Sequence, residues 1–262
     1  MRTLPRPPRR PSPRAPHGLP ERLLDRLPRR LTAGAAETGS NLAAWARDYA
    51  YALRWQAAGL LRRPDPLGYR RGAPDRPAVV LIPGIYESWT FLLPVAELLR
   101  GHGYGVHVVE DLKYNTGTIE EMARLVDRHI RDEGIERCVL VAHSKGGLIG
   151  KRLLSHHNDA TAIQGLVAIN TPFTGSKLAY LLPLPAIRVF LPHSPELTEL
   201  TSSRHVDQHI VSIYGRFDPH IPGGSRLEGA RNVQLETRGH FLPLSDPRVH
   251  EAVVDGVRTL SR

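Results

Sequence analysis

The feature that most constrains the fold of this sequence is a regular alternation of short apolar runs and helix-like stretches from residue 78 onward. The apolar runs occupy residues 78–83, 105–110, 137–143, 163–170, 209–215 and 232–236. Helical patterns lie between or after them at residues 88–100, 118–132, 145–157 and 247–260. Short, nearly continuous apolar runs are typical of strands that are buried on both faces, as in parallel sheets. The alternation therefore predicts an α/β domain, with a mostly parallel central sheet and helices on both faces.

One segment of this domain, roughly residues 172–206, breaks the alternation. It is rich in Leu and Pro, and its prolines at positions 183, 185, 192 and 195 predict short helices or turns. It also holds more apolar side chains than an exposed loop of this length needs. These are Leu178, Leu181, Leu182, Leu184, Ile187, Phe190 and Leu191. We therefore expect a cap or lid insertion, which is either mobile or packed permanently on the sheet.

The segment ahead of this domain, residues 38–66, is predicted to form a helical N-terminal extension that ends at two prolines. Ser40 or Asn41 is the candidate N-cap. The apolar stripe of this helix comprises Leu42, Trp45, Tyr49, Ala52 or Leu53, and Leu60. Tyr51 and Trp55 lie off the stripe, and we expect them to pack against the main domain rather than against a membrane or a partner.

The first 37 residues form an Arg- and Pro-rich tail that we expect to be largely disordered. Residues 1–30 hold 9 Arg against 2 acidic residues, together with 8 of the 23 prolines, so like charges repel and regular structure is prevented. The other residues carry 26 Lys and Arg against 24 Asp and Glu, so the net charge of +9 belongs mainly to the tail. Attraction to anionic lipid or nucleic acid is one interpretation. We favour a solvated tail, or a start codon placed too far upstream, and expect no nucleic-acid partner.

The sequence contains no evident secretory signal or transmembrane segment. The tail lacks an apolar core followed by a small-residue cleavage site, and no run of 18 or more apolar residues occurs. Cys138 is the single cysteine, so it can form no intramolecular disulfide, and its apolar surroundings predict a buried structural thiol. We expect a cytoplasmic protein, with peripheral membrane contact and oligomeric state left open.

The third apolar run leads into the stretch VLVAHSKGGLIG, residues 139–150, where a buried strand meets a serine and a helix starts at once. Such a sharp turn needs small residues two positions before and after the serine. Ala142 and Gly146 occupy these positions around Ser144, and Gly147 lets the helix approach the sheet. This is the small-x-Ser-x-Gly form of the nucleophile elbow, which presents a serine oxygen at the edge of a sheet.

A serine hydroxyl is a weak nucleophile unless a base accepts its proton and an acid orients that base. Asp218 and His240 each follow a later apolar run, so both are expected on loops at the carboxyl ends of strands. We therefore predict a catalytic triad of Ser144, His240 and Asp218. His220 is a rival base, but on the loop that carries Asp218 it could hardly be oriented by that carboxylate.

The negative charge that develops on a carbonyl oxygen under attack needs preorganised hydrogen-bond donors. One candidate donor is the backbone N–H of Lys145, because it opens the helix after the serine. The second candidate is the backbone N–H of Ile85, in the turn LIPGIYES, where Gly84 allows a close approach of the backbone. These two groups are the predicted oxyanion hole.

From about residue 77 to its end, the chain resembles the α/β-hydrolase fold superfamily, and within it the bacterial lipase-like serine esterases. The resemblance rests on the motifs PGIYES, AHSKGG, INTPFTGS, GRFDPHIP and GHFLPL. It implies an α/β-hydrolase catalytic domain at residues 67–262, whose lid covers an apolar acyl pocket and opens at a lipid surface. The sequence has Pro83 where a histidine is common in the oxyanion turn. It also has Lys145 in place of the usual Met or Gln, which predicts a more polar or cationic pocket rim.

These features predict a serine carboxylic-ester hydrolase that acts through an acyl-enzyme on a small-molecule or lipid ester. The candidate substrate-binding residues are Tyr86, His143, Phe173, Phe190 and Phe241. Two alternatives stay open: an acyltransferase with the same triad, and a non-catalytic α/β-hydrolase scaffold that binds a ligand or a membrane surface. No metal or cofactor is expected, because the sequence has no His-Glu-x-x-His motif, no thiolate cluster, and no nucleotide-binding fingerprint.

Overall fold

The computed structural model of the protein describes residues 29–61, 64–158, 162–182 and 184–262. The chain divides after Ser40, and residues Asn41–Arg262 form one compact unit. The described residues that precede this unit belong to helix α1 (Arg29–Leu61). Most of the predicted tail, residues 1–28, lies outside the described residues. Among those described, no helix combines the length and the apolar character needed to cross a membrane.

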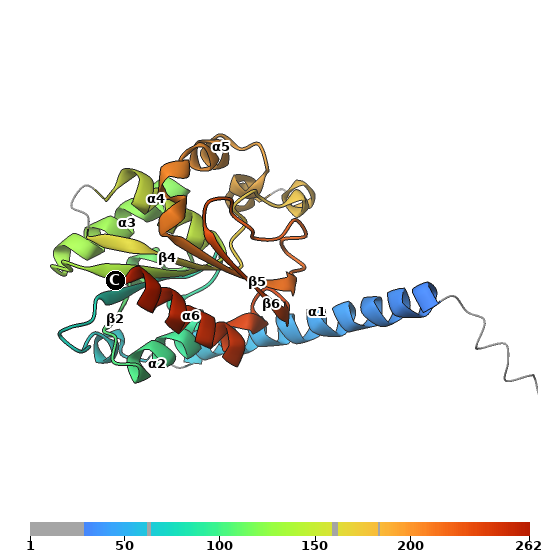
Figure 1. Cartoon of the computed structure of the whole chain (residues 1–262), viewed down its shortest axis with the longest axis horizontal. Helices are drawn as coiled ribbons and strands as arrows, with labels where there is room; N and C mark the ends of the chain where they lie inside the picture. The colour runs from blue at the N-terminus through green and yellow to red at the C-terminus, as the bar shows by residue number, and fades with distance from the viewer. Residues whose placement is uncertain (1–28, 62–63, 159–161, 183) are drawn as a thin grey trace, which may run out of the picture. The chain divides into compact units, whose positions relative to one another are not determined.

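Six parallel strands form the central sheet of the compact unit (Figure 1). They are β1 (Ala78–Ile82), β2 (Val106–Val108), β3 (Cys138–His143), β4 (Ile163–Ile169), β5 (Ile210–Phe217) and β6 (Arg231–Arg238). Their order across the sheet is β2-β1-β3-β4-β5-β6, and every neighbouring pair is parallel. The predicted parallel sheet is therefore confirmed. Its strands all end at the same edge, where their loops can bring together residues that are far apart in the sequence.

The helices cover both faces of this sheet (Figure 1). They are α2 (Leu93–Gly101), α3 (Ile119–Asp132), α4 (Lys145–His156), α5 (Pro195–Ser202) and α6 (Pro247–Leu260). Because strand side chains alternate in direction, Leu140 and Ala142 of β3 join the apolar core beneath α3 and α4. Val139 and Val141 point the other way and join the core beneath α2 and α6. The predicted coverage of both faces is confirmed.

Short 3₁₀ helices occupy several of the connections. They are η2 (Pro66–Tyr69), η3 (Trp89–Leu92), η4 (Glu110–Leu112), η5 (Lys177–Leu181), η6 (Pro185–Phe190), η7 (Arg204–His209) and η8 (Leu242–Ser245). The helix predicted at residues 88–100 is divided in this way into η3 and α2. Pro94 stands in the first turn of α2, where its missing N–H costs no intrahelical hydrogen bond.

Helix α1 starts earlier than predicted. It begins at Arg29 rather than at Thr38, and it continues through Ser40 and Asn41, so neither of these residues is its N-cap. Alanines at positions 33, 35 and 36 favour this continuation, because alanine has the highest intrinsic helix propensity. The N-cap preference of a single polar residue therefore did not decide where the helix begins.

The face of α1 that packs on the domain also differs from the predicted stripe. Asp48 and Tyr51 are buried, and Trp55 packs against the core that α2 and α6 share. Trp45 and Leu53, which belong to the predicted stripe, are exposed. The packing of Tyr51 and Trp55 against the domain was predicted correctly. The stripe was wrong because a buried carboxylate lies on the packed face, and apolar periodicity cannot detect it.

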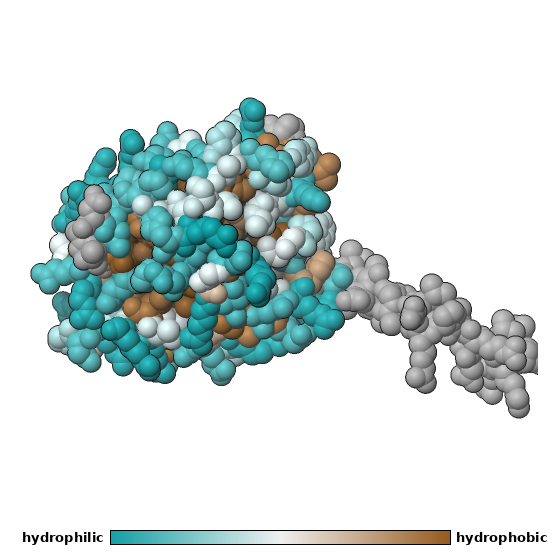
Figure 2. Space-filling view, turned by 45° about the horizontal axis from the view of Figure 1, so that its top comes forward, coloured by the Kyte–Doolittle hydropathy of each residue, from teal (hydrophilic) through white to brown (hydrophobic). Residues whose placement is uncertain are grey.

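The insertion at residues 172–206 consists of short helices, as its prolines predicted. Its later part is anchored to the domain, because Phe190 and Leu197 are buried in the core beneath α3 and α4. Directly after the insertion, Asp207 forms a buried ion pair of 2.6 Å with Lys151 of α4. Its earlier part exposes Tyr180, Leu181, Leu182 and Leu184. Figure 2 shows one face of the surface, where hydrophobic residues emerge at several places among polar ones.

Candidate active site

Ser144 lies at the tip of β3, where the chain turns directly into α4. Its backbone has a φ of 52° and a ψ of −122°, a conformation that non-glycine residues rarely adopt. A Cβ atom added at Gly146 would lie 2.2 Å from the carbonyl oxygen of Ile82, and one at Gly147 would lie 2.0 Å from Thr171 Oγ1. A side chain at either position would therefore force the neighbouring chain to move. The small residues of the elbow motif are required by this close packing.

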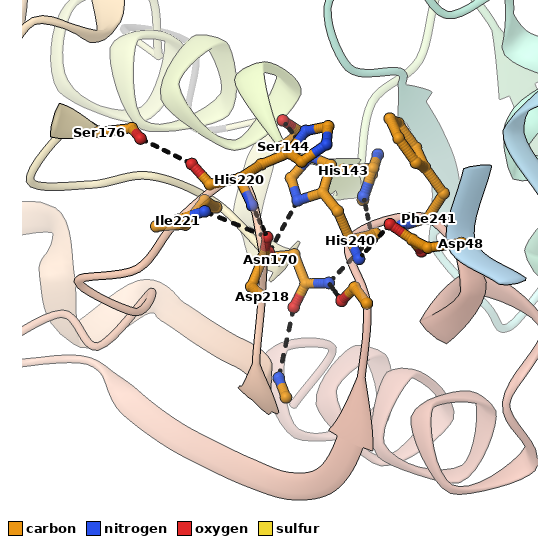
Figure 3. Close-up of polar contacts among 12 residues, drawn as sticks. Asp48, His143, Ser144, Asn170, Ser176, Asp218, His220, Ile221, His240 and Phe241 are labelled. Carbon is orange, nitrogen blue, oxygen red and sulfur yellow. Dashed lines mark hydrogen bonds and ion pairs between the residues drawn. The ribbon is translucent and has the colours of Figure 1, made fainter. Parts of the chain in front are cut away.

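The loops after β5 and β6 bring Asp218 and His240 to Ser144 (Figure 3). His240 Nε2 lies 2.9 Å from Ser144 Oγ, and His240 Nδ1 lies 2.7 Å from Asp218 Oδ2. All three side chains are buried. The imidazole thus bridges the hydroxyl group and the carboxylate. In this arrangement it can accept the serine proton while the carboxylate holds the ring in place.

The electrostatic surroundings of His240 favour its protonated form. Burial lowers the pKa of His240, because the imidazolium loses its hydration. The charge and hydrogen bond of Asp218 oppose this effect, and the charges of Glu87 and Asp48 add to that opposition. The result is a pKa above the ordinary value for histidine. The carboxylates would therefore stabilise the imidazolium that forms once the ring has accepted a proton.

The other oxygen of Asp218 is held by its own loop. Asp218 Oδ1 accepts hydrogen bonds from the backbone N–H groups of His220 at 2.8 Å and Ile221 at 3.1 Å. Only Oδ2 is directed at His240. The loop thus sets the rotation of the carboxylate as well as its position.

His220, the rival base, is placed against His240 rather than against the serine. The two rings stack with centroids 4.6 Å apart and planes 19° apart. Burial and the neighbouring His240 lower the pKa of His220 to about 3, so it is neutral at physiological pH. Its Nε2 lies 2.9 Å from the hydroxyl oxygen of Tyr49, which can donate a hydrogen bond to it. His220 therefore covers one face of the His240 ring.

Two N–H groups of the turn after β1, those of Gly84 and Tyr86, have hydrogen-bond partners within the protein. The Gly84 N–H donates to Glu87 Oε2 at 2.8 Å, and the Tyr86 N–H donates to the carbonyl oxygen of Tyr114 at 2.7 Å. The N–H of Ile85 lies between these two engaged groups, and that of Lys145 lies in the first turn of α4. These two donors were the ones predicted, and backbone N–H groups suit an anionic oxygen.

Among the described residues, no group of three or more His, Cys, Asp or Glu side chains is arranged to hold a metal ion.

The side chain of Lys145 does not line the pocket rim, contrary to the prediction. It is fully buried, and its Nζ donates to the carbonyl oxygens of Asn115, at 2.9 Å, and Gly117. Burial lowers the pKa of Lys145 to about 8. The side chain thus holds the loop between η4 and α3, while the backbone of Lys145 begins α4 directly after Ser144.

His143 also differs from its predicted role in substrate binding. It is fully buried, and its Nδ1 lies 2.8 Å from Glu87 Oε1. Its Nε2 lies 3.0 Å from the carbonyl oxygen of His240. Both ring nitrogens therefore have partners inside the protein, which leaves none for a substrate. His143 instead connects the turn after β1 to the loop that carries His240.

The other predicted substrate-binding residues lie in different surroundings. Phe173 and Phe190 are buried in the apolar core beneath α3 and α4. Tyr86 is exposed, with a left-handed φ of 59°. Phe241 is half-buried, and the centroid of its ring lies 4.9 Å from that of His240. Of these four residues, Phe241 is therefore the one with a described contact to the His240 ring.

Sequence reasoning missed two residues that hold the histidine loop. Asp48 of α1 accepts a hydrogen bond from the backbone N–H of His240, which is 192 residues away along the sequence. Asn170, at the end of β4, donates from Nδ2 to the carbonyl oxygen of His240 at 3.0 Å. Asn170 has a left-handed φ of 46°, and the stretch INTP that contains it was part of the recognised motifs. No local signal marked Asp48, because its partners are distant backbone groups.

Of the comparisons with known proteins, the one with solved structures supports the fold. No protein-family model matches the sequence, and no curated protein matches it. Solved structures do match. A monoacylglycerol lipase from Paleococcus ferrophilus is 21% identical, with 73% of this chain and 97% of that chain covered and a TM-score of 0.52. A lipase from Bacillus licheniformis in its mature form is 19% identical, with coverages of 76% and 96% and a TM-score of 0.54.

A third similar structure is a putative hydrolase from Agrobacterium vitis. It is 20% identical, with 74% of this chain and 91% of that chain covered and a TM-score of 0.52. At this level of identity the likeness concerns the fold alone. Together with the strand order and the elbow between β3 and α4, it confirms the α/β-hydrolase fold that the sequence predicted.

Proposed function

We propose that this chain, which has the α/β-hydrolase fold, is a serine carboxylic-ester hydrolase that works through an acyl-enzyme. The observation that carries the proposal is the hydrogen-bonded series Asp218–His240–Ser144, which is buried at the carboxyl edge of the sheet. Ser144 is the nucleophile, His240 the base and then the acid, and Asp218 the group that orients the imidazole. The substrate is a small-molecule or lipid ester.

In the first half of the reaction, Ser144 Oγ attacks the ester carbonyl carbon as its proton passes to His240 Nε2. The electron pair of the carbonyl double bond moves onto its oxygen, which the N–H groups of Ile85 and Lys145 stabilise. That electron pair then re-forms the double bond, the bond to the alcohol oxygen breaks, and His240 gives its proton to the departing alcohol. The products of this half are the free alcohol and a Ser144 acyl ester.

In the second half, water takes the place of the serine hydroxyl. His240 accepts a proton from the water as the water oxygen attacks the acyl carbon, and the same two N–H groups stabilise the oxyanion. Collapse of this intermediate breaks the bond to Ser144 Oγ, which recovers its proton from His240. The carboxylic acid leaves, and the enzyme returns to its starting state.

The names of two similar structures favour an ester with an acyl chain as the substrate. The Paleococcus ferrophilus protein is a monoacylglycerol lipase, and the Bacillus licheniformis protein is a lipase. The insertion agrees with such a substrate, because it exposes apolar side chains on the part that follows β4. We infer that the acyl chain is the part of the substrate that the insertion covers.

Turnover of p-nitrophenyl esters by the purified protein tests this proposal. A panel from acetate to palmitate should be hydrolysed, and a fluorophosphonate probe should label Ser144, as located by mass spectrometry of the labelled peptide. Absence of both turnover and labelling would favour a non-catalytic scaffold. Acyl esters of an added alcohol that form faster than the free acid would favour an acyltransferase.

The exposed apolar side chains of the insertion lead to a prediction about aggregated substrates. We expect the rate on a medium-chain ester to rise steeply as its concentration crosses the aggregation limit, because apolar side chains of the insertion gain contact with the aggregate. The combined substitution Leu181→Ser and Leu182→Ser should flatten this rise, since both side chains are exposed. Initial rates measured across the aggregation limit provide the test.

Leu67→Ser is the matched control, because Leu67 is also exposed and lies outside the insertion. It should leave the rise unchanged. Phe190, although central in the insertion, is unsuitable, because it is buried and its replacement would leave a cavity in the core. A smooth saturation curve through the aggregation limit in the unmodified protein would favour a fixed cap and an esterase for dissolved esters.

A further inference from the structure

Helix α1 places a carboxylate against the loop that carries His240 (Figure 3). Asp48 is fully buried. Its Oδ2 accepts a hydrogen bond from the N–H of His240 at 2.9 Å. Its Oδ1 accepts from the N–H groups of Phe241 and Leu242, each at 2.7 Å. One side chain therefore binds three consecutive backbone N–H groups, starting with that of the proposed base.

The backbone of the loop that carries His240 leaves space for the Asp48 carboxylate. Gly239 precedes His240 and has a φ of 114°, which side chains rarely allow. A Cβ atom at Gly239 would lie 2.6 Å from Asp48 Oδ1. The glycine thus serves both the turn and the close approach of Asp48. The N–H of Leu242 opens the 3₁₀ helix η8, where backbone donors have no partner within the helix.

The backbone of His240 is held on its other side as well. Its carbonyl oxygen faces His143 Nε2 and Asn170 Nδ2, each at 3.0 Å. His143 is the last residue of β3 and Asn170 directly follows β4, so both are positioned by the sheet of the α/β-hydrolase fold. Asp48 comes from the helix ahead of that domain. Asp48 of α1 therefore holds the N–H groups of His240 and Phe241, while His143 and Asn170 hold the carbonyl oxygen of His240.

We propose that Asp48 is a positioning residue, which holds the His240 loop so that the imidazole reaches both Ser144 and Asp218. This inference rests on the proposed function, because it assigns His240 the role of the base. It also makes the second part of α1 a required part of the active site. A hydrolase domain cut at residue 67 would lack one of the three groups that hold the backbone of its base.

Asp48 is one of several charged or titratable groups around His240. The others are Asp218 and His220 after β5, Glu87 after β1, and His143 at the end of β3. Because His240 must be neutral to act as a base, kcat/KM falls as the pH drops through its pKa. Loss of the negative charge of Asp48 lowers that pKa and moves the acid limb to lower pH. A merely structural role would not move this limb.

The test compares Asp48→Asn with the unmodified full-length protein. We expect kcat to fall about 10- to 100-fold with little change in KM, because a misplaced base slows the reaction without removing the substrate site. The acid limb of kcat/KM should move to lower pH. Asp48→Glu keeps the charge, so its kcat should fall while its acid limb stays in place. Rates are normalised to the fraction that is folded by circular dichroism.

Asp65→Asn is the matched control. Asp65 is an exposed carboxylate that likewise accepts a backbone N–H, from Leu67 at 2.9 Å, outside the site. It should change neither kcat nor the acid limb. If Asp48→Asn keeps the kcat and the pH profile of the unmodified protein, the inference is overturned.

A measurement that does not need turnover separates this inference from the proposed function. The proton resonances of His240 can be followed by NMR as a function of pH in both proteins. A lower pKa of His240 in Asp48→Asn supports the coupling to Asp48 even if no ester is hydrolysed. Absence of ester turnover and Ser144 labelling in the unmodified protein would instead refute the proposed function. An unchanged pKa of His240 in Asp48→Asn would contradict the proposed coupling between Asp48 and His240.

Discussion

Replacing Ser144 by Ala is expected to abolish ester turnover, with a fall in kcat of about 10⁴-fold or more. The substitution removes one oxygen, which is the proposed nucleophile and the hydrogen-bond partner of His240 Nε2. It leaves in place the packing of Gly146 and Gly147, which gives the elbow its shape. The melting temperature should therefore change little. Steady-state hydrolysis of p-nitrophenyl butyrate and a thermal melt measure the two effects.

Ser155→Ala is the matched control for this prediction. Ser155 lies on α4, the helix that Ser144 begins, and its hydroxyl donates to the carbonyl oxygen of Lys151 at 2.9 Å. This substitution should keep both turnover and labelling by a fluorophosphonate. Persistent turnover in Ser144→Ala, or labelling of a different serine in the unmodified protein, would contradict the assignment of the nucleophile.

The sheet was predictable because its signal is local. A strand buried on both faces needs an apolar side chain at almost every position, and β3 has six buried residues in succession. The elbow was predictable for a related reason, since its close packing excludes side chains at Gly146 and Gly147. Asp218 and His240 could then be located because the carboxyl ends of parallel strands meet at one edge. Each of these inferences required only a strand and the residue that follows it.

The parts that sequence reasoning missed depend on contacts between distant segments. From the sequence alone, Asp48 would be expected to be an exposed acidic residue of an amphipathic helix. In the structure it is buried against backbone N–H groups that are 192 to 194 residues away along the sequence. Hydrophobic periodicity assigns polar residues to the solvent-exposed face of a helix. It therefore predicted that the wrong face of α1 packs against the domain. Glu87 and His143 form a similar buried pair, across 56 residues. A single sequence carries no information on such pairings.

Long side chains produced the remaining errors. Lys145 was expected at the pocket rim, but its four-carbon stem lets the ammonium group reach the carbonyl oxygen of Asn115, away from the start of α4 where its backbone follows Ser144. Phe190 was predicted to bind substrate because it lies within an apolar insertion, and the structure shows that it is buried in the core. The composition of the segment indicated a cap or lid insertion. It could not indicate which side chains face inward and which face the solvent.

Replacing Asp218 by Asn should lower kcat by about 10⁴-fold while the protein stays folded. The substitution is nearly isosteric, and the oxygen that binds the N–H groups of His220 and Ile221 can be kept as the amide oxygen. Hydrolysis rates, with circular dichroism as the check of folding, measure the effect. His220→Phe is the control on the same loop. Its ring can still stack on His240, so its kcat should fall far less.

The size of the expected loss follows from the fixed rotation of the Asp218 side chain. Because two N–H groups hold the oxygen at the Oδ1 position, the amide NH₂ of the variant must point at His240 Nδ1. A donor in that place turns Nδ1 into an acceptor, so the neutral ring carries its proton on Nε2. A protonated Nε2 cannot accept the proton of Ser144, 2.9 Å away. Full activity of Asp218→Asn would mean that another group orients His240, and the assignment of the acid would be wrong.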